Sequence, residues 1–165
     1  MKRKLLSAIT LIAVLLAILS ACSGVSGKNA AIDDFSARVA SIAKENSELA
    51  GYSMSGLTEE GNGTYAASAV IDGETIGAIS IVVADKQVTE LSFSFSGAVA
   101  IDKCMLAATA SAMAVDSALD YSEAYEMMAR IIIRSFVISE SRENNGYSYT
   151  AWYENELLFV KMSKI

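Results

Sequence analysis

A change in hydrophobic period near residue 97 is the feature that most limits how this chain can fold. Before it, three β-leaning segments at 64–71, 74–84 and 88–97 are separated by turn signals, of which Asp72-Gly73 is the strongest. In the third segment, Leu91, Phe93 and Phe95 alternate with serines, which is the pattern of a strand with one apolar and one wet face. A weaker segment at 52–57 has the character of an edge strand. These consecutive hairpins predict an antiparallel meander of three or four strands.

Helical spacing is present before and after this predicted meander. Residues 30–50 carry an apolar stripe at intervals of 3, 4 and 3, and residues 101–119 carry one built largely of small side chains. A third helix is expected from Glu123 to Ser139, with Ser122 as its N-cap. The side chains expected to face inward are Ile32, Phe35, Val39, Ile42, Ile101, Met105, Ala108, Ala112, Val115, Leu119, Met127, Met128, Ile131, Ile132 and Val137 or Ile138.

Alternation returns in the last twenty residues of the chain. Aromatic and polar residues alternate over 147–153, residues 154–155 form a tight turn, and 156–164 completes a C-terminal hairpin. The expected order is therefore helix, three or four strands, two helices and two strands. The simplest packing is a single α+β domain over residues 30–165, in which helices cover one face of an antiparallel sheet.

The first 22 residues have the organisation of an export signal. Residues 1–4 carry three positive charges, and residues 5–21 follow as seventeen uncharged residues that end in small side chains. The tetrapeptide LSAC at 19–22 resembles the lipobox of bacterial lipoproteins. An uncleaved membrane anchor is the alternative, although seventeen residues lie at the lower limit for a transmembrane helix, which needs about 20.

The lipobox resemblance covers residues 1–22 and implies a cellular location and a lipid anchor. Residues 1–21 would be removed as a signal peptide, and Cys22 would carry diacylglycerol and further acyl chains such as palmitate. Residues 22–29 would then be a short Gly/Ser-rich tether that holds the domain close to the extracytoplasmic side of the cell membrane. Because Ser23 and not Asp follows the cysteine, outer-membrane sorting is expected if the host has an outer membrane.

Composition excludes several classes of function. After cleavage before Cys22, the chain would contain ten Lys and Arg and 19 Asp and Glu. The resulting net charge of −9 disfavours binding to nucleic acid. The chain has no histidine, which excludes Ser-His-Asp and Cys-His catalysis and histidine-ligated zinc. Cys104 lies in an apolar helical stretch and is expected to be a buried structural thiol. We therefore expect no catalytic residues, no metal and no cofactor.

The best candidate for a contact surface is the aromatic C-terminal hairpin, because Tyr and Trp are enriched in interfaces. Its candidate residues are Tyr147, Tyr149, Trp152 and Tyr153. The sequence leaves open whether Trp152 or the tyrosines face water. The expected function is a non-enzymatic module at the cell envelope that binds an unknown protein or small ligand. The alternatives are an accessory subunit of a membrane complex and an enzyme that uses only carboxylate, Ser or Tyr side chains.

Overall fold

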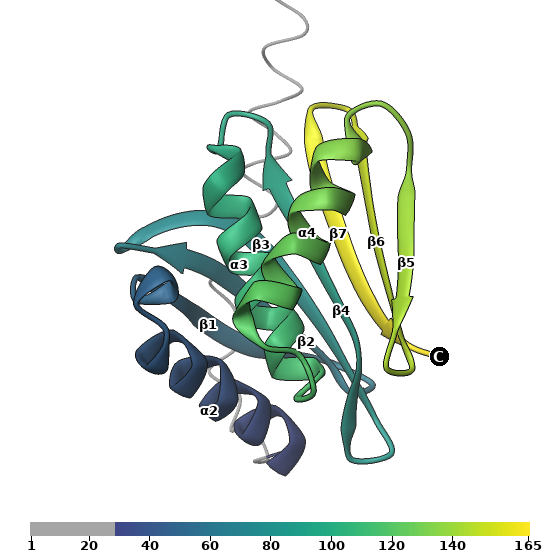
Figure 1. Ribbon diagram of the computed structural model, residues 1–165. Coiled ribbons are helices and arrows are strands. Elements are labelled where there is room, and N and C mark those ends of the chain that lie inside the picture. Colours follow the sequence, from purple (N-terminus) through teal and green to yellow (C-terminus); the bar gives the residue numbers. More distant parts are fainter. Residues whose placement is uncertain (1–28) are drawn as a thin grey trace, which may run out of the picture.

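A computed structural model describes residues 29–165, so the predicted signal peptide, Cys22 and all but the last residue of the predicted tether lie outside it. The described chain forms one seven-stranded sheet in the order β1-β2-β3-β4-β7-β6-β5, with every neighbouring pair antiparallel (Figure 1). The strands are β1 (Tyr52–Gly61), β2 (Thr64–Ile71), β3 (Glu74–Ala84), β4 (Gln87–Ser96), β5 (Glu140–Asn144), β6 (Tyr147–Glu154) and β7 (Leu157–Lys164).

The helices cover one face of this sheet, which confirms the predicted α+β class (Figure 1). They are α2 (Ala30–Glu45), α3 (Ile101–Val115) and α4 (Tyr121–Ser135), with a single 3-10 turn, η1 (Ser47–Leu49), after α2. Helix α3 lies between α2 and α4 and contacts both of them. The buried alanines of α3 allow its backbone to approach the neighbouring elements closely, and one continuous core results.

Strand β4 joins the meander to the C-terminal hairpin. It pairs with β3 on one side and with β7 on the other, where Leu91 lies opposite Met162. The predicted alternation of β4 is confirmed: Leu91, Phe93 and Phe95 are buried beneath the helices, while the intervening serines face the other side. The rings of Phe93 and Phe95 stack with their centroids 5.3 Å apart.

Helix α4 begins and ends earlier than its sequence pattern predicts. Its N-cap is Asp120 and not Ser122, because the Asp120 carboxylate accepts a hydrogen bond of 2.9 Å from the backbone N–H of Glu123. At the other end, the N–H groups of Val137 and Ile138 both donate to the carbonyl of Arg134, and the chain leaves the helix. The prediction that Val137 or Ile138 faces inward is wrong, since both are exposed.

Strand β5 was not expected from the sequence. It has the residues ESREN, which carry no apolar alternation, because β5 is an edge strand with largely exposed side chains. Glu140 lies opposite Ala151 on β6, and four further pairs follow to the turn at Asn145-Gly146. The closing region therefore has three strands where two were predicted, and β5 covers the outer edge of β6.

Cys104 is a buried thiol of α3, as predicted. Burial raises its pKa to about 12, and nearby Asp102 contributes in the same direction. A thiol with such a pKa stays protonated at neutral pH and is a poor nucleophile.

Candidate protein-interaction site

The four aromatic residues proposed from the sequence as a binding surface do not lie together. Tyr147, Tyr149 and Tyr153 share one parity on β6 and face the helices, whereas Trp152 faces the opposite side of the sheet. Tyr149 is completely buried, at 0 % exposure, so it cannot belong to an exposed surface. Each of the four belongs to a different environment.

Tyr149 is part of a partly buried polar cluster at the end of α3. Its hydroxyl donates to Oδ2 of Asp116 at 3.2 Å, and the side-chain amide of Asn145 donates to the same oxygen at 3.0 Å. The backbone N–H of Ala118 donates to the other carboxylate oxygen at 3.1 Å. Burial, and then the nearby negative charge of Asp116, raise the pKa of Tyr149, so its hydroxyl remains a donor. This cluster ties α3 to the β5–β6 turn and has a structural role.

Trp152 lies on the sheet face that no described helix covers (Figure 1). It stacks on Phe159 of β7, with ring centroids 5.1 Å apart and the planes 12° from parallel. Phe159 in turn lies opposite Ser94, and most other outward side chains of this face are small or hydroxyl-bearing. Because Trp152 and Phe159 shield one another and are each half-buried, they form an isolated aromatic pair and not an extended apolar patch.

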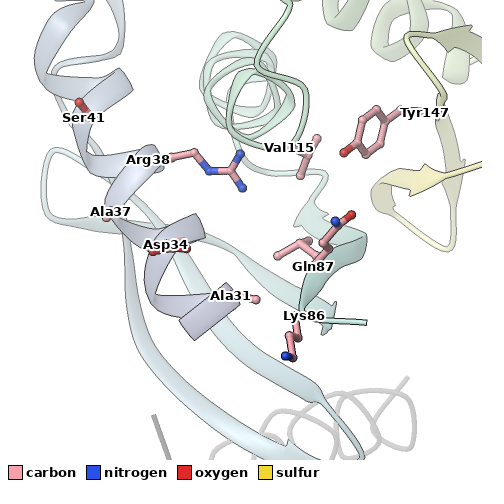
Figure 2. A pocket seen from close by; sticks show the side chains of 10 residues that line it. Ala31, Asp34, Ala37, Arg38, Ser41, Lys86, Gln87, Val115 and Tyr147 are labelled. Carbon is pink, nitrogen blue, oxygen red and sulfur yellow. The ribbon is translucent and has the colours of Figure 1, made fainter. Parts of the chain in front are cut away.

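Tyr147 is half-buried and lies at the start of β6, where it lines an open groove between α2 and the β3–β4 turn (Figure 2). Its ring also contacts that of Tyr149, with centroids 6.3 Å apart.

Tyr153 is the one member of the four that lies against a group of exposed apolar residues. Its ring packs on Phe136 at a centroid distance of 4.8 Å. Phe136 follows the last turn of α4. Its neighbours in the sequence, Ile133, Val137 and Ile138, also have exposed side chains. We call Ile133, Phe136, Val137, Ile138 and Tyr153 the apolar end.

The apolar end exposes more apolar surface than single hydrophobic residues ordinarily do. Its exposed fractions are 57 % for Ile133, 47 % for Phe136, 86 % for Val137, 57 % for Ile138 and 38 % for Tyr153. Leu157, the first residue of β7 after the β6–β7 turn, is also exposed. The end of α4 and this turn lie at the same end of the sheet (Figure 1). Contiguous exposed apolar surfaces mark interaction sites more often than they mark neutral surface.

Charged residues border the apolar end. Arg134 and Arg142 both approach one carboxylate oxygen of Glu140, at 3.2 and 3.9 Å. On the other border, Glu154 at the end of β6 and Glu156 in the β6–β7 turn are exposed, with no ion-pair partner among residues 29–165. An apolar centre with a polar border is the usual organisation of a protein interface, and here part of the border is acidic.

Sequence reasoning missed this site because Val137 and Ile138 were assigned to the core. A signal was nevertheless present: IIIRSFVI contains more apolar residues than one face of a helix can bury. Ile131 and Ile132 occupy the buried face of α4, and the remaining apolar side chains of this run are left outside.

The described residues contain no group of three or more Cys, Asp or Glu side chains placed to hold a metal ion. Within the same residues, no helix has both the length and the apolar character needed to cross a membrane.

Comparisons with protein-family models, with curated proteins and with solved structures found no match to this chain.

Proposed function

We propose that this protein is a lipid-anchored, non-enzymatic module on the extracytoplasmic side of a bacterial cell membrane, and that its apolar end binds another protein. The observation that carries the proposal is the run from Ile133 to Ile138, in which four large apolar side chains are exposed beside Tyr153. Leaving this much apolar surface in water is unfavourable, by roughly 25 cal/mol for each Å² that a partner could cover. This supports an accessory subunit of a larger assembly over an isolated ligand-binding domain.

The position of the apolar end supports a protein partner over contact with the bilayer. Asn29, where the tether joins the domain, precedes the first turn of α2, which lies beside Lys86 and Gln87 at the start of β4. The apolar end lies at the finish of β4, where the N–H of Gly97 donates to the carbonyl of Glu156 in the β6–β7 turn. The ten residues of β4 separate the two ends by roughly 33 Å. An anchor at Cys22 would therefore join the domain at the end opposite to the apolar end.

Charge favours a different protein over a second copy of this one. The mature chain has a net charge of −9, so two copies repel each other. Glu154 and Glu156 border the apolar end. The partner surface that fits best is apolar at its centre and basic where it meets the β6–β7 turn.

A photo-crosslinking amino acid at position 137 tests the proposed docking. Placed in the full-length protein in its native cells, it is expected to give one dominant adduct with a protein of different mass. Adding Ile138→Glu should reduce this adduct about tenfold or more, because the charge must be desolvated in an apolar interface. Mass spectrometry of the adduct measures the result.

The matched control places the same crosslinker at Glu60, an exposed position on the distant edge strand β1. It should not give the adduct obtained at 137. Equal adducts at both positions, adducts only with lipid, or an adduct only of two copies of this chain would each contradict the proposal.

Replacement of Cys22 by alanine tests the anchor separately from the docking. If Cys22 carries the lipid, the variant should lose all incorporation of labelled palmitate, because the thiol is the acceptor for the diacylglycerol group. It should also accumulate as uncleaved precursor or leave the membrane fraction. The control is Cys104→Ala, which removes a thiol that is buried in the fold and should leave labelling unchanged. Unchanged labelling of Cys22→Ala would show that the lipobox resemblance is misleading.

A further inference from the structure

An open groove of about 730 Å³ lies at the other end of the domain, remote from the apolar end. It is formed by the first turns of α2, the β3–β4 turn, the end of α3 and the start of β6, as Figure 2 shows. The positions that define it are Asp34 and Arg38 on α2, Lys86 and Gln87 at the β3–β4 turn, Val115 on α3 and Tyr147 on β6. A volume of this size accommodates a small organic molecule.

Three side chains that can donate hydrogen bonds line this groove. The guanidinium of Arg38 extends from α2 toward Val115, and the hydroxyl of Tyr147 and the amide of Gln87 lie on the other side of Val115 (Figure 2). Within residues 29–165, no carboxylate lies within ion-pair distance of Arg38. Arg38 is exposed at the groove surface, so its guanidinium is available to a ligand.

The orientation of the Gln87 amide is determined by a neighbour outside the groove. Lys164 at the end of β7 donates from Nζ to Oε1 of Gln87 at 2.6 Å. Because the amide oxygen is engaged by this ammonium group, the NH₂ side of the amide is directed toward the groove. Gln87 therefore adds donors to those of Arg38, and the site is suited to a ligand that supplies acceptors.

The charges of the lining select among anionic ligands. Arg38 and Lys86 contribute two positive charges and Asp34 contributes one negative charge, so the ionisable lining has a net charge of +1. A single carboxylate balances this charge and matches the planar fork of an arginine side chain. A phosphate dianion would exceed the available charge and would be repelled by Asp34. Val88 and Val115 provide an apolar wall for the body of the ligand.

We propose that this groove binds a small organic acid through its carboxylate, with Arg38 as the main contact and with Gln87 and Tyr147 as supporting donors. The site is independent of the docking proposed for the apolar end, because the two lie at opposite ends of β4 and share no residue.

Titration of the full-length protein in detergent, followed by amide NMR, tests this site with butyrate as the probe. Butyrate is expected to shift the signals of Gln87 and its neighbours to saturation. Butylamine, which has a similar alkyl chain and the opposite charge, should shift none of them. Inorganic phosphate should bind at least about tenfold more weakly than butyrate, since it lacks the apolar body and carries excess charge.

Two variants separate a specific site from general charge attraction. Arg38→Gln should weaken butyrate binding by about tenfold or more, because it removes a charge-assisted pair of hydrogen bonds. Lys44→Gln, which removes an exposed charge at the other end of α2, should leave binding unchanged. Because both side chains are exposed, the amide spectra should show both variants folded. Unchanged affinity of Arg38→Gln, equal shifts with butylamine, or tighter binding of phosphate than of butyrate would overturn the proposal.

Discussion

Replacing Phe95 by alanine is expected to lower the free energy of unfolding by about 3–5 kcal/mol, as for other buried phenylalanines. Phe95 is completely buried on the central strand β4 and stacks on Phe93. Its ring also covers Gly77 on β3, where a Cβ atom would lie 2.7 Å from Cδ1 of Phe95. Truncation would therefore open a cavity between the sheet and the helices and uncover the backbone of a glycine.

Urea denaturation followed by circular dichroism measures this loss. The matched control is Ser94→Ala, one residue earlier on the same strand but facing away from the helices, which should change stability by less than about 0.5 kcal/mol. The two variants differ mainly in the face of the sheet that they alter. Similar losses for both would contradict the assignment of a single covered face.

Replacing Asp116 by alanine is expected to cost about 3 kcal/mol, since it leaves the buried hydroxyl of Tyr149 without an acceptor and removes two further hydrogen bonds. Asp116 accepts hydrogen bonds from Tyr149, Asn145 and the backbone of Ala118, and it is almost fully buried. The hydroxyl of Tyr149 would lose its partner in a place that water does not reach. The melting temperature should fall accordingly.

Tyr149→Phe is the comparison for this second prediction. It removes one donor and leaves Asp116 with two partners, so a cost of only about 1 kcal/mol is expected. The double variant should lose less stability than the sum of the two single-variant losses, because the interaction between the two side chains can be removed only once. Strictly additive losses would indicate that the hydrogen bond between Asp116 and Tyr149 contributes nothing to stability.

Much of the fold follows from local patterns in the sequence. The segments 64–71 and 74–84 form strands with the expected bounds, because alternation and the Asp72-Gly73 turn act over a few neighbouring residues. Strand β5 was not predicted because an exposed edge strand needs no apolar residues, and its extended conformation comes from pairing with the distant strand β6. The early end of α4 was not predicted because hydrophobic periodicity does not show at which residue a helix leaves the core.

The candidate sites depend on contacts between distant parts of the chain. The apolar end combines the last turn of α4 with Tyr153 of β6, and the groove combines α2 with the β3–β4 turn and β6. No spacing in the sequence connects Arg38 with Gln87 and Tyr147. The hairpin proposed from the sequence does not act as one surface: strand parity and position along β6 place its four aromatic residues in the core, on the outer face, in the groove and at the apolar end.

The last strand of the chain occupies an interior position of the sheet, between β4 and β6. Synthesis proceeds from the N-terminus, so the first four strands are made before the strand that will complete their open side exists. Until the final residues emerge, the newly made polypeptide exposes the unpaired backbone groups of β4, which could pair with another copy or with a chaperone. The sheet therefore cannot be completed before β7 is made, and a premature stop before β7 would leave its strands in two separate groups.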